Sequence, residues 1–152
     1  MKKILLNVED SYVPLVLRIF LSVVIFPHGA QKLAGWFNGY GFEGTMSYFT
    51  NDVGLPWIIG VLVIIIEFFG PIFILVGLAT RVWCLAMLVV MAGIIVTVMN
   101  DYFFMNWEGT RPTEGFEFFL LVIGMSLALI VSGGGRLSLD SLWVNKKQRS
   151  RG

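Results

Sequence analysis

Residues 57–78 read WIIGVLVIIIEFFGPIFILVGL, an apolar run with a single carboxylate, Glu67, near its middle. In a helix that rises about 1.5 Å per residue, this run spans about 33 Å, which matches the hydrocarbon thickness of a bilayer. An acidic side chain at that depth costs about 2.5–3.5 kcal/mol on insertion scales. We therefore expect a membrane-spanning helix whose Glu67 pairs with a group from another helix.

The composition extends this interpretation to the whole chain. Hydrophobic residues make up 57% and charged residues 14% of the 152 residues, and the mean hydropathy is +0.80. These values lie beyond the usual balance of a soluble domain. The chain is predicted to be one integral membrane domain over residues 1–140, followed by a basic cytoplasmic tail over 141–152 that we expect to be disordered.

The run at 57–78 is the second of four along the chain; the others lie at about residues 12–34, 82–102 and 116–132. Only residues 79–81 separate the second run from the third, so short a connection that these two helices are predicted to form an antiparallel hairpin. The longer connections are rich in aromatic residues, and the first favours a short interfacial helix over residues 44–50. The predicted fold is all-α, a bundle of four transmembrane helices with this short interfacial helix in its first outer loop.

The basic residues indicate the orientation of this bundle. Cytoplasmic loops carry an excess of lysine and arginine, and here nine of the 11 fall on one side. Both termini are therefore predicted to be cytoplasmic, and both aromatic loops to lie outside. The nine are Lys2, Lys3, Arg18, Arg81, Arg136, Lys146, Lys147, Arg149 and Arg151, against Lys32 and Arg111 on the other side.

The first run carries the polar groups that could meet Glu67. At 100° per residue, Arg18, Gly29 and Lys32 fall within about 60° of one another, with His28 at the edge of this stripe. By depth, Glu67 lies about 7–8 Å from either Arg18 or His28. Two interpretations remain open: a structural Arg18–Glu67 ion pair, or an outward-facing pocket in which Glu67, His28 and Lys32 exchange protons with a bound small molecule.

The third and fourth runs carry fewer candidate functional residues. Glu117 begins the fourth run on the same face as Gly124 and Ala128, so its carboxylate is predicted to point into the bundle. In the third run Gly93 suits close helix packing rather than chemistry. The aromatic residues, Trp36 among them, form either a headgroup belt or the mouth of a quinone-sized pocket. One histidine and one cysteine without ligand spacing predict no metal or haem site.

Five segments together resemble the DoxX family of four-helix membrane proteins, over roughly residues 18–140. They are FPHGAQKLAGWF (26–37), FEGTMSYF (42–49), EFFGPIFILVGLATR (67–81), GFEFFLL (115–121) and GRLSLD (135–140). The resemblance implies a multi-pass protein of the bacterial cytoplasmic membrane, associated with quinone-linked oxidation of sulfur compounds, oxidative stress and thiol redox balance. The positions that match the family's polar pattern are Arg18, His28, Gln31, Lys32, Glu67, Arg81, Glu117 and Asp140.

The first functional hypothesis is a membrane subunit that binds a quinone or similar small molecule between the first, second and fourth helices, in their outer half. It has no redox cofactor of its own and acts with a partner oxidoreductase, so it is at most an oxidoreductase subunit. The alternatives are a small proton- or solute-conducting permease, which would need to oligomerise to enclose a lumen, and a structural anchor. The ligand-binding candidates are Arg18, His28, Gln31, Lys32, Trp36, Glu67 and Glu117, of which His28, Lys32 and Glu67 are also the catalytic candidates.

Overall fold

The computed structural model describes residues 11–143, and all the regular secondary structure within that range is helical. Three helices are long and apolar enough to cross a membrane: α2 (Val13–Ala34), α4 (Trp57–Val76) and α5 (Thr80–Thr97). A fourth apolar helix, α6 (Glu117–Ser132), has 16 residues. The all-helical fold and three helices suited to span a membrane are thus confirmed, while the fourth span stays a prediction. A short helix covers 139–143, and the rest of the predicted tail lies outside the described residues.

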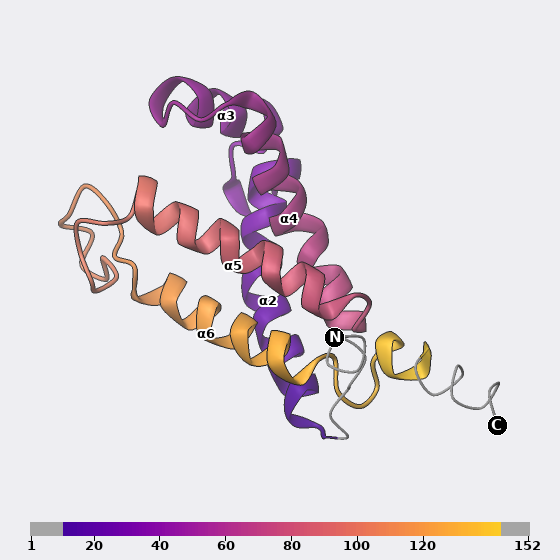
Figure 1. Ribbon diagram of the computed structural model, residues 1–152. Coiled ribbons are helices and arrows are strands. Elements are labelled where there is room, and N and C mark those ends of the chain that lie inside the picture. Colours follow the sequence, from indigo (N-terminus) through magenta and orange to yellow (C-terminus); the bar gives the residue numbers. More distant parts are fainter. Residues whose placement is uncertain (1–10, 144–152) are drawn as a thin grey trace, which may run out of the picture.

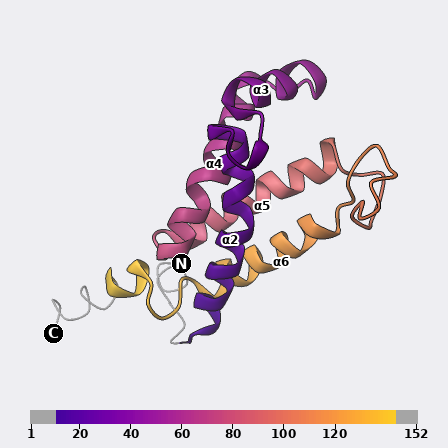
Figure 2. The ribbon, with the colours of Figure 1, turned by 180° about the vertical axis from the view of Figure 1, so that it is seen from behind.

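The long helices pack as two pairs, α2 along α4 and α5 along α6 (Figures 1 and 2). The pairs meet where α4 turns into α5, and they spread apart in the opposite direction. We call the first region the turn end; it comprises residues 77–80 and 133–143. The opposite region, the loop end, comprises the two long connections, residues 35–56 and 98–116.

The crossing of α2 and α4 is fixed by a glycine and a proline. Pro71 has no N–H, so it cannot donate the helical hydrogen bond to the carbonyl of Glu67, four residues earlier. The backbone of Gly29 lies directly against that carbonyl, and a Cβ at this position would overlap it. Nearby, the Ser22 hydroxyl donates to the Pro71 carbonyl at 2.8 Å. The two helices therefore approach most closely one turn from Lys32.

The turn between α4 and α5 confirms the predicted hairpin. Gly77 ends α4 in the left-handed region, at a φ of 70°, and α5 begins at Thr80. A Cβ on Gly77 would overlap the guanidinium of Arg18, so both the backbone conformation and the space require glycine here.

The first long connection is helical where a short helix was predicted. It contains η1 (Trp36–Asn38), α3 (Gly41–Ser47) and a π-helical turn, η2 (Tyr48–Asp52), so the predicted helix at 44–50 falls across α3 and η2. The position of this segment at a membrane interface remains a prediction.

The hydrophobic core lies where the two helix pairs meet. Leu21 and Ile25 of α2 and Ile74 of α4 are buried there with residues of α5 and α6. The buried face of α6 consists of Val122, Ser126 and Leu129, whereas Gly124 and Ala128 are exposed. The prediction that these two share an inward face with Glu117 is therefore wrong, because α6 packs on α5 through its other side.

Candidate functional site

Glu67 forms an ion pair with Lys32. The Lys32 ammonium lies 2.5 Å from a carboxylate oxygen of Glu67, whose side chain is only 2% exposed, against 25% for Lys32. Lys32 stands in the last turn of α2, one turn beyond the crossing at Gly29. A basic partner from the first helix was the expectation for Glu67, and the structure confirms it.

Arg18 is held far from this pair. It lies eleven residues before Gly29, about 16 Å along the axis of α2. Its guanidinium is completely buried at the turn end, where it donates to the carbonyl oxygens of Arg136 at 3.3 Å and Leu137 at 3.1 Å. The sequence left open whether Glu67 pairs with Arg18 or with His28 and Lys32, and the position of the helix crossing selects Lys32 and excludes Arg18.

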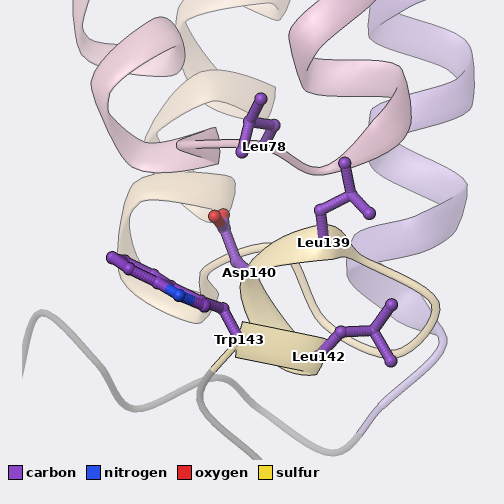
Figure 3. A pocket seen from close by; sticks show the side chains of 5 residues that line it. All are labelled: Leu78, Leu139, Asp140, Leu142 and Trp143. Carbon is purple, nitrogen blue, oxygen red and sulfur yellow. The ribbon is translucent and has the colours of Figure 1, made fainter. Parts of the chain in front are cut away.

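Asp140 completes the polar cluster at the turn end, which we call the turn-end cluster: Arg18, Gly77, Thr80 and Asp140. One carboxylate oxygen of Asp140 accepts from the Ala79 N–H at 2.8 Å, and the other accepts from the N–H and hydroxyl of Thr80 at 2.9 and 2.8 Å. Its own N–H donates to the carbonyl of Gly77 at 2.9 Å. Figure 3 shows the carboxylate pointing toward the α4–α5 turn that holds Leu78. Asp140 therefore caps α5 and fastens the C-terminal segment to the bundle.

A cavity of about 550 Å³ lies at the loop end, between the two helix pairs. Residues from all four long helices and from both loops line it, and most of them are apolar. The titratable and hydroxyl-bearing residues in its wall are His28, Lys32, Tyr48, Glu67, Thr97 and Glu114.

The cavity brings together three of the predicted site residues, His28, Lys32 and Glu67, and leaves the other four outside its wall. Arg18 belongs to the turn-end cluster. Gln31 donates to the Phe37 carbonyl at 3.3 Å, and the Trp36 ring packs edge-on against Phe26. Glu117 accepts from the N–H of Met105 at 2.8 Å. These four side chains therefore have structural contacts rather than a place at the cavity.

Sequence reasoning missed the contribution of α5. Gly93 was expected to pack closely against a neighbour, yet a Cβ there would meet nothing within 4 Å, and Gly93 lines the cavity with Thr97. The expectation was wrong because α5 diverges from α4 toward the loop end. The only available signal was that Gly93 and Thr97 stand one helical turn apart, on the same face.

The second loop lines part of the cavity and is held by acidic residues at and just before the start of α6. Glu114, which lines the cavity, accepts from the N–H of Asn106 at 2.8 Å, and Glu117 accepts from the neighbouring N–H of Met105. The Asn106 side chain in turn accepts from the N–H of Thr110 at 3.0 Å. These bonds fix the loop's backbone beside the cavity.

Chemically, the cavity offers a carboxylate, an ammonium and an imidazole within apolar walls. The His28 ring lies 5.7 Å from the ring of Phe118, so an aromatic surface borders the polar groups. Such a set suits a flat molecule with hydrogen-bonding oxygens. No group of histidine, cysteine and acidic side chains able to hold a metal ion occurs among residues 11–143.

Comparison with known proteins places the chain in a sequence family and finds two relatives. A sequence model described as DoxX matches residues 13–100. The "Putative oxidoreductase CatD" of Bacillus subtilis (strain 168) is 31% identical over 126 residues, which cover 83% of each chain. The "Inner membrane protein YqjF" of Escherichia coli (strain K12) is 32% identical over 142 residues, 93% of this chain and 98% of that protein. No solved structure gives a significant match.

Proposed function

This chain belongs to the DoxX family, and we propose that it is a membrane subunit of a redox system that binds the head of a quinone in the loop-end cavity. The observation that carries the proposal is the Lys32–Glu67 ion pair, which borders this apolar cavity instead of being sealed between helices. An ammonium can donate to a ring carbonyl, and a carboxylate can accept from a ring hydroxyl, so the pair suits both the quinone and the hydroquinone.

In this proposal the chain crosses the inner membrane four times, with α6 as the fourth span and both termini in the cytoplasm. The loop end then faces outward, together with the cavity. The asymmetry of lysine and arginine supports the orientation, and the name of the Escherichia coli relative supports the membrane.

A partner protein carries the redox centre. Reduction of a quinone to a hydroquinone takes two electrons, which that partner supplies, and two protons, which His28 and the Lys32–Glu67 pair are placed to relay. The name of the Bacillus subtilis relative supports a redox role. The chain contributes binding and proton transfer in oxidative-stress or thiol redox balance, without a redox cofactor of its own.

A conducting permease fits the structure less well. Below the cavity, at and near the turn end, Arg18, Ile74 and Thr80 are completely buried. A solute or proton path through the bundle would have to pass this packed region, whereas a binding site requires only the cavity at the loop end.

The experiment is to measure the affinity of a labelled quinone analogue for purified protein in lipid nanodiscs, comparing wild type with Glu67→Gln, Lys32→Met and His28→Ala. A hydrogen bond to a charged group contributes about 1.5–3 kcal/mol, so Glu67→Gln or Lys32→Met should weaken binding by roughly 10- to 150-fold. Glu43→Gln, an exposed acid on α3, is the matched control and should bind like wild type. Equal affinity for wild type and all three cavity variants would place any quinone site elsewhere.

A further inference from the structure

The wall of the loop-end cavity is not equally closed on all sides. Ile25, from α2, is 1% exposed, whereas Leu62 of α4 is 45% and Val89 of α5 is 61% exposed. Gly93, also on α5, is exposed as well. In addition to the exposed surface at His28 and Tyr48, the cavity therefore has an open side between α4 and α5.

This opening lies at the depth of the lipid chains. Counted from the loop-end termini of their helices, Gly93, Leu62 and Val89 lie about 6, 8 and 12 Å down the axis. Both helices are strongly apolar and long enough to cross the hydrocarbon of a bilayer. A molecule that enters between them comes from hydrocarbon rather than from water.

Both loops contribute apolar side chains to the cavity. Phe49, Val53 and Leu55 of the first loop and Met105 of the second line the cavity at the loop end. The backbone of the second loop is held there by Glu114 and Glu117. Apolar side chains therefore line the cavity at its loop end too, which suits an apolar ring or tail better than a charged soluble molecule.

We propose that the cavity takes a membrane-resident amphiphile, whose polar head reaches the Lys32–Glu67 pair and whose apolar tail leaves between α4 and α5 into the bilayer. The inference rests on the proposed binding function and adds to it the access route and the requirement for a tail. The tail is selected by the residues at the opening, Leu62, Val89 and Gly93.

Gly93 makes the inference testable with a matched control. A side chain added at Gly93 projects into open space at the cavity wall, so Gly93→Phe blocks the tail path without disturbing the backbone. Gly124 of α6 is also exposed and helical, with nothing within 4 Å of a Cβ, and it does not line the cavity. Leu62→Trp narrows the same opening from α4 and replaces Gly93→Phe if that variant does not fold.

The experiment uses palmitic acid with a terminal diazirine, in phosphatidylcholine nanodiscs that contain the full-length protein. After photolysis we expect label on Val90 and Met91, which line the cavity but are only 7% and 2% exposed. Gly93→Phe should reduce this labelling at least fivefold, and Gly124→Phe should leave it unchanged. Label confined to exposed residues, or unaffected by Gly93→Phe and Leu62→Trp, would overturn the proposal.

A second measurement separates this inference from the proposed function. The same variants are titrated with a decyl-tailed quinone and with its tail-less counterpart. Gly93→Phe should weaken binding of the tailed quinone about tenfold and change that of the tail-less one less than twofold. If the fatty acid labels Met91 but neither quinone binds, the quinone function fails and the access route stands. If both quinones bind equally well to wild type and to Gly93→Phe, without label on Met91, the access route fails and the function stands.

Discussion

Each end of the bundle sets a basic side chain of α2 near an acid from another segment, and the buried member of the pair is Arg18 at the turn end but Glu67 at the loop end. At the turn end, Arg18 donates to backbone carbonyls and both carboxylate oxygens of Asp140 accept from the start of α5. At the loop end, Lys32 and Glu67 pair beside a cavity of about 550 Å³. The difference lies in where the buried charge faces: the Arg18 guanidinium is enclosed and meets backbone carbonyls, whereas the Glu67 carboxylate lines the cavity. Where the backbone takes up its hydrogen bonds, the charge is part of the fold.

The largest expected effect is at the turn end. Asp140→Ala removes the cap of α5 and leaves the buried N–H and hydroxyl of Thr80 without their acceptor. We expect a loss of about 3–5 kcal/mol of unfolding free energy, measured by unfolding in a denaturing detergent. Quinone affinity of the protein that remains folded should change less than twofold. Asp52→Ala, at an exposed acid, is the control and should leave both stability and affinity unchanged. If Asp140→Ala lowers quinone affinity without lowering stability, the two ends do not differ as argued.

Gly29→Ala tests the crossing that separates the two ends. The added methyl group overlaps the Glu67 carbonyl, so α2 must move away from α4. Overpacking of this kind costs about 1–3 kcal/mol, and the displacement should also weaken the Lys32–Glu67 contact and with it quinone binding. Gly124→Ala, made in open space, should be neutral or slightly stabilising. Full stability and binding in Gly29→Ala would show that the crossing does not position the pair.

Substitution of Glu67 should affect stability less than substitution of Asp140. Glu67→Gln keeps the shape and a hydrogen-bonding oxygen, and the partly exposed Lys32 can extend toward the loop-end interface, so we expect a cost of about 1 kcal/mol. Glu67→Ala should cost more, because it also leaves empty volume. Both are measured by the same unfolding assay. Equal and negligible effects would mean that Glu67 is solvated rather than paired.

The smallest effect is expected at the aromatic surface of the first loop. The Trp36 side chain is 53% exposed, contacts Phe26 and stays outside the cavity wall. Trp36→Ala should therefore cost about 0.5 kcal/mol or less and change quinone affinity less than twofold. A tenfold loss of affinity in the same nanodisc titration would instead make Trp36 part of the mouth of the pocket.

Much of the fold could be predicted because it depends on local properties. The length of the run at 57–78 and the cost of a charge in hydrocarbon require a span and a partner for Glu67. The three residues after Leu78 require a hairpin, and the polar stripe of the first helix holds the partner. Each of these inferences needs only the helical rise and repeat.

Tertiary structure decided which base reaches Glu67 and which helix opens the cavity. Helical periodicity groups Arg18 and Lys32 on one face, but it does not say where along that face another helix crosses. Gly29 contacts the carbonyl of Glu67, to which Pro71 cannot donate a hydrogen bond, and this contact sets the crossing point of the two helices. The crossing point in turn selects Lys32 as the partner of Glu67. Likewise, Gly93 and Gly124 are both open helical glycines, and only the divergence of α5 from α4 places one of them at a cavity. The sequence by itself determined the spans and the polar face, and the meeting of helices distant in sequence determined the site.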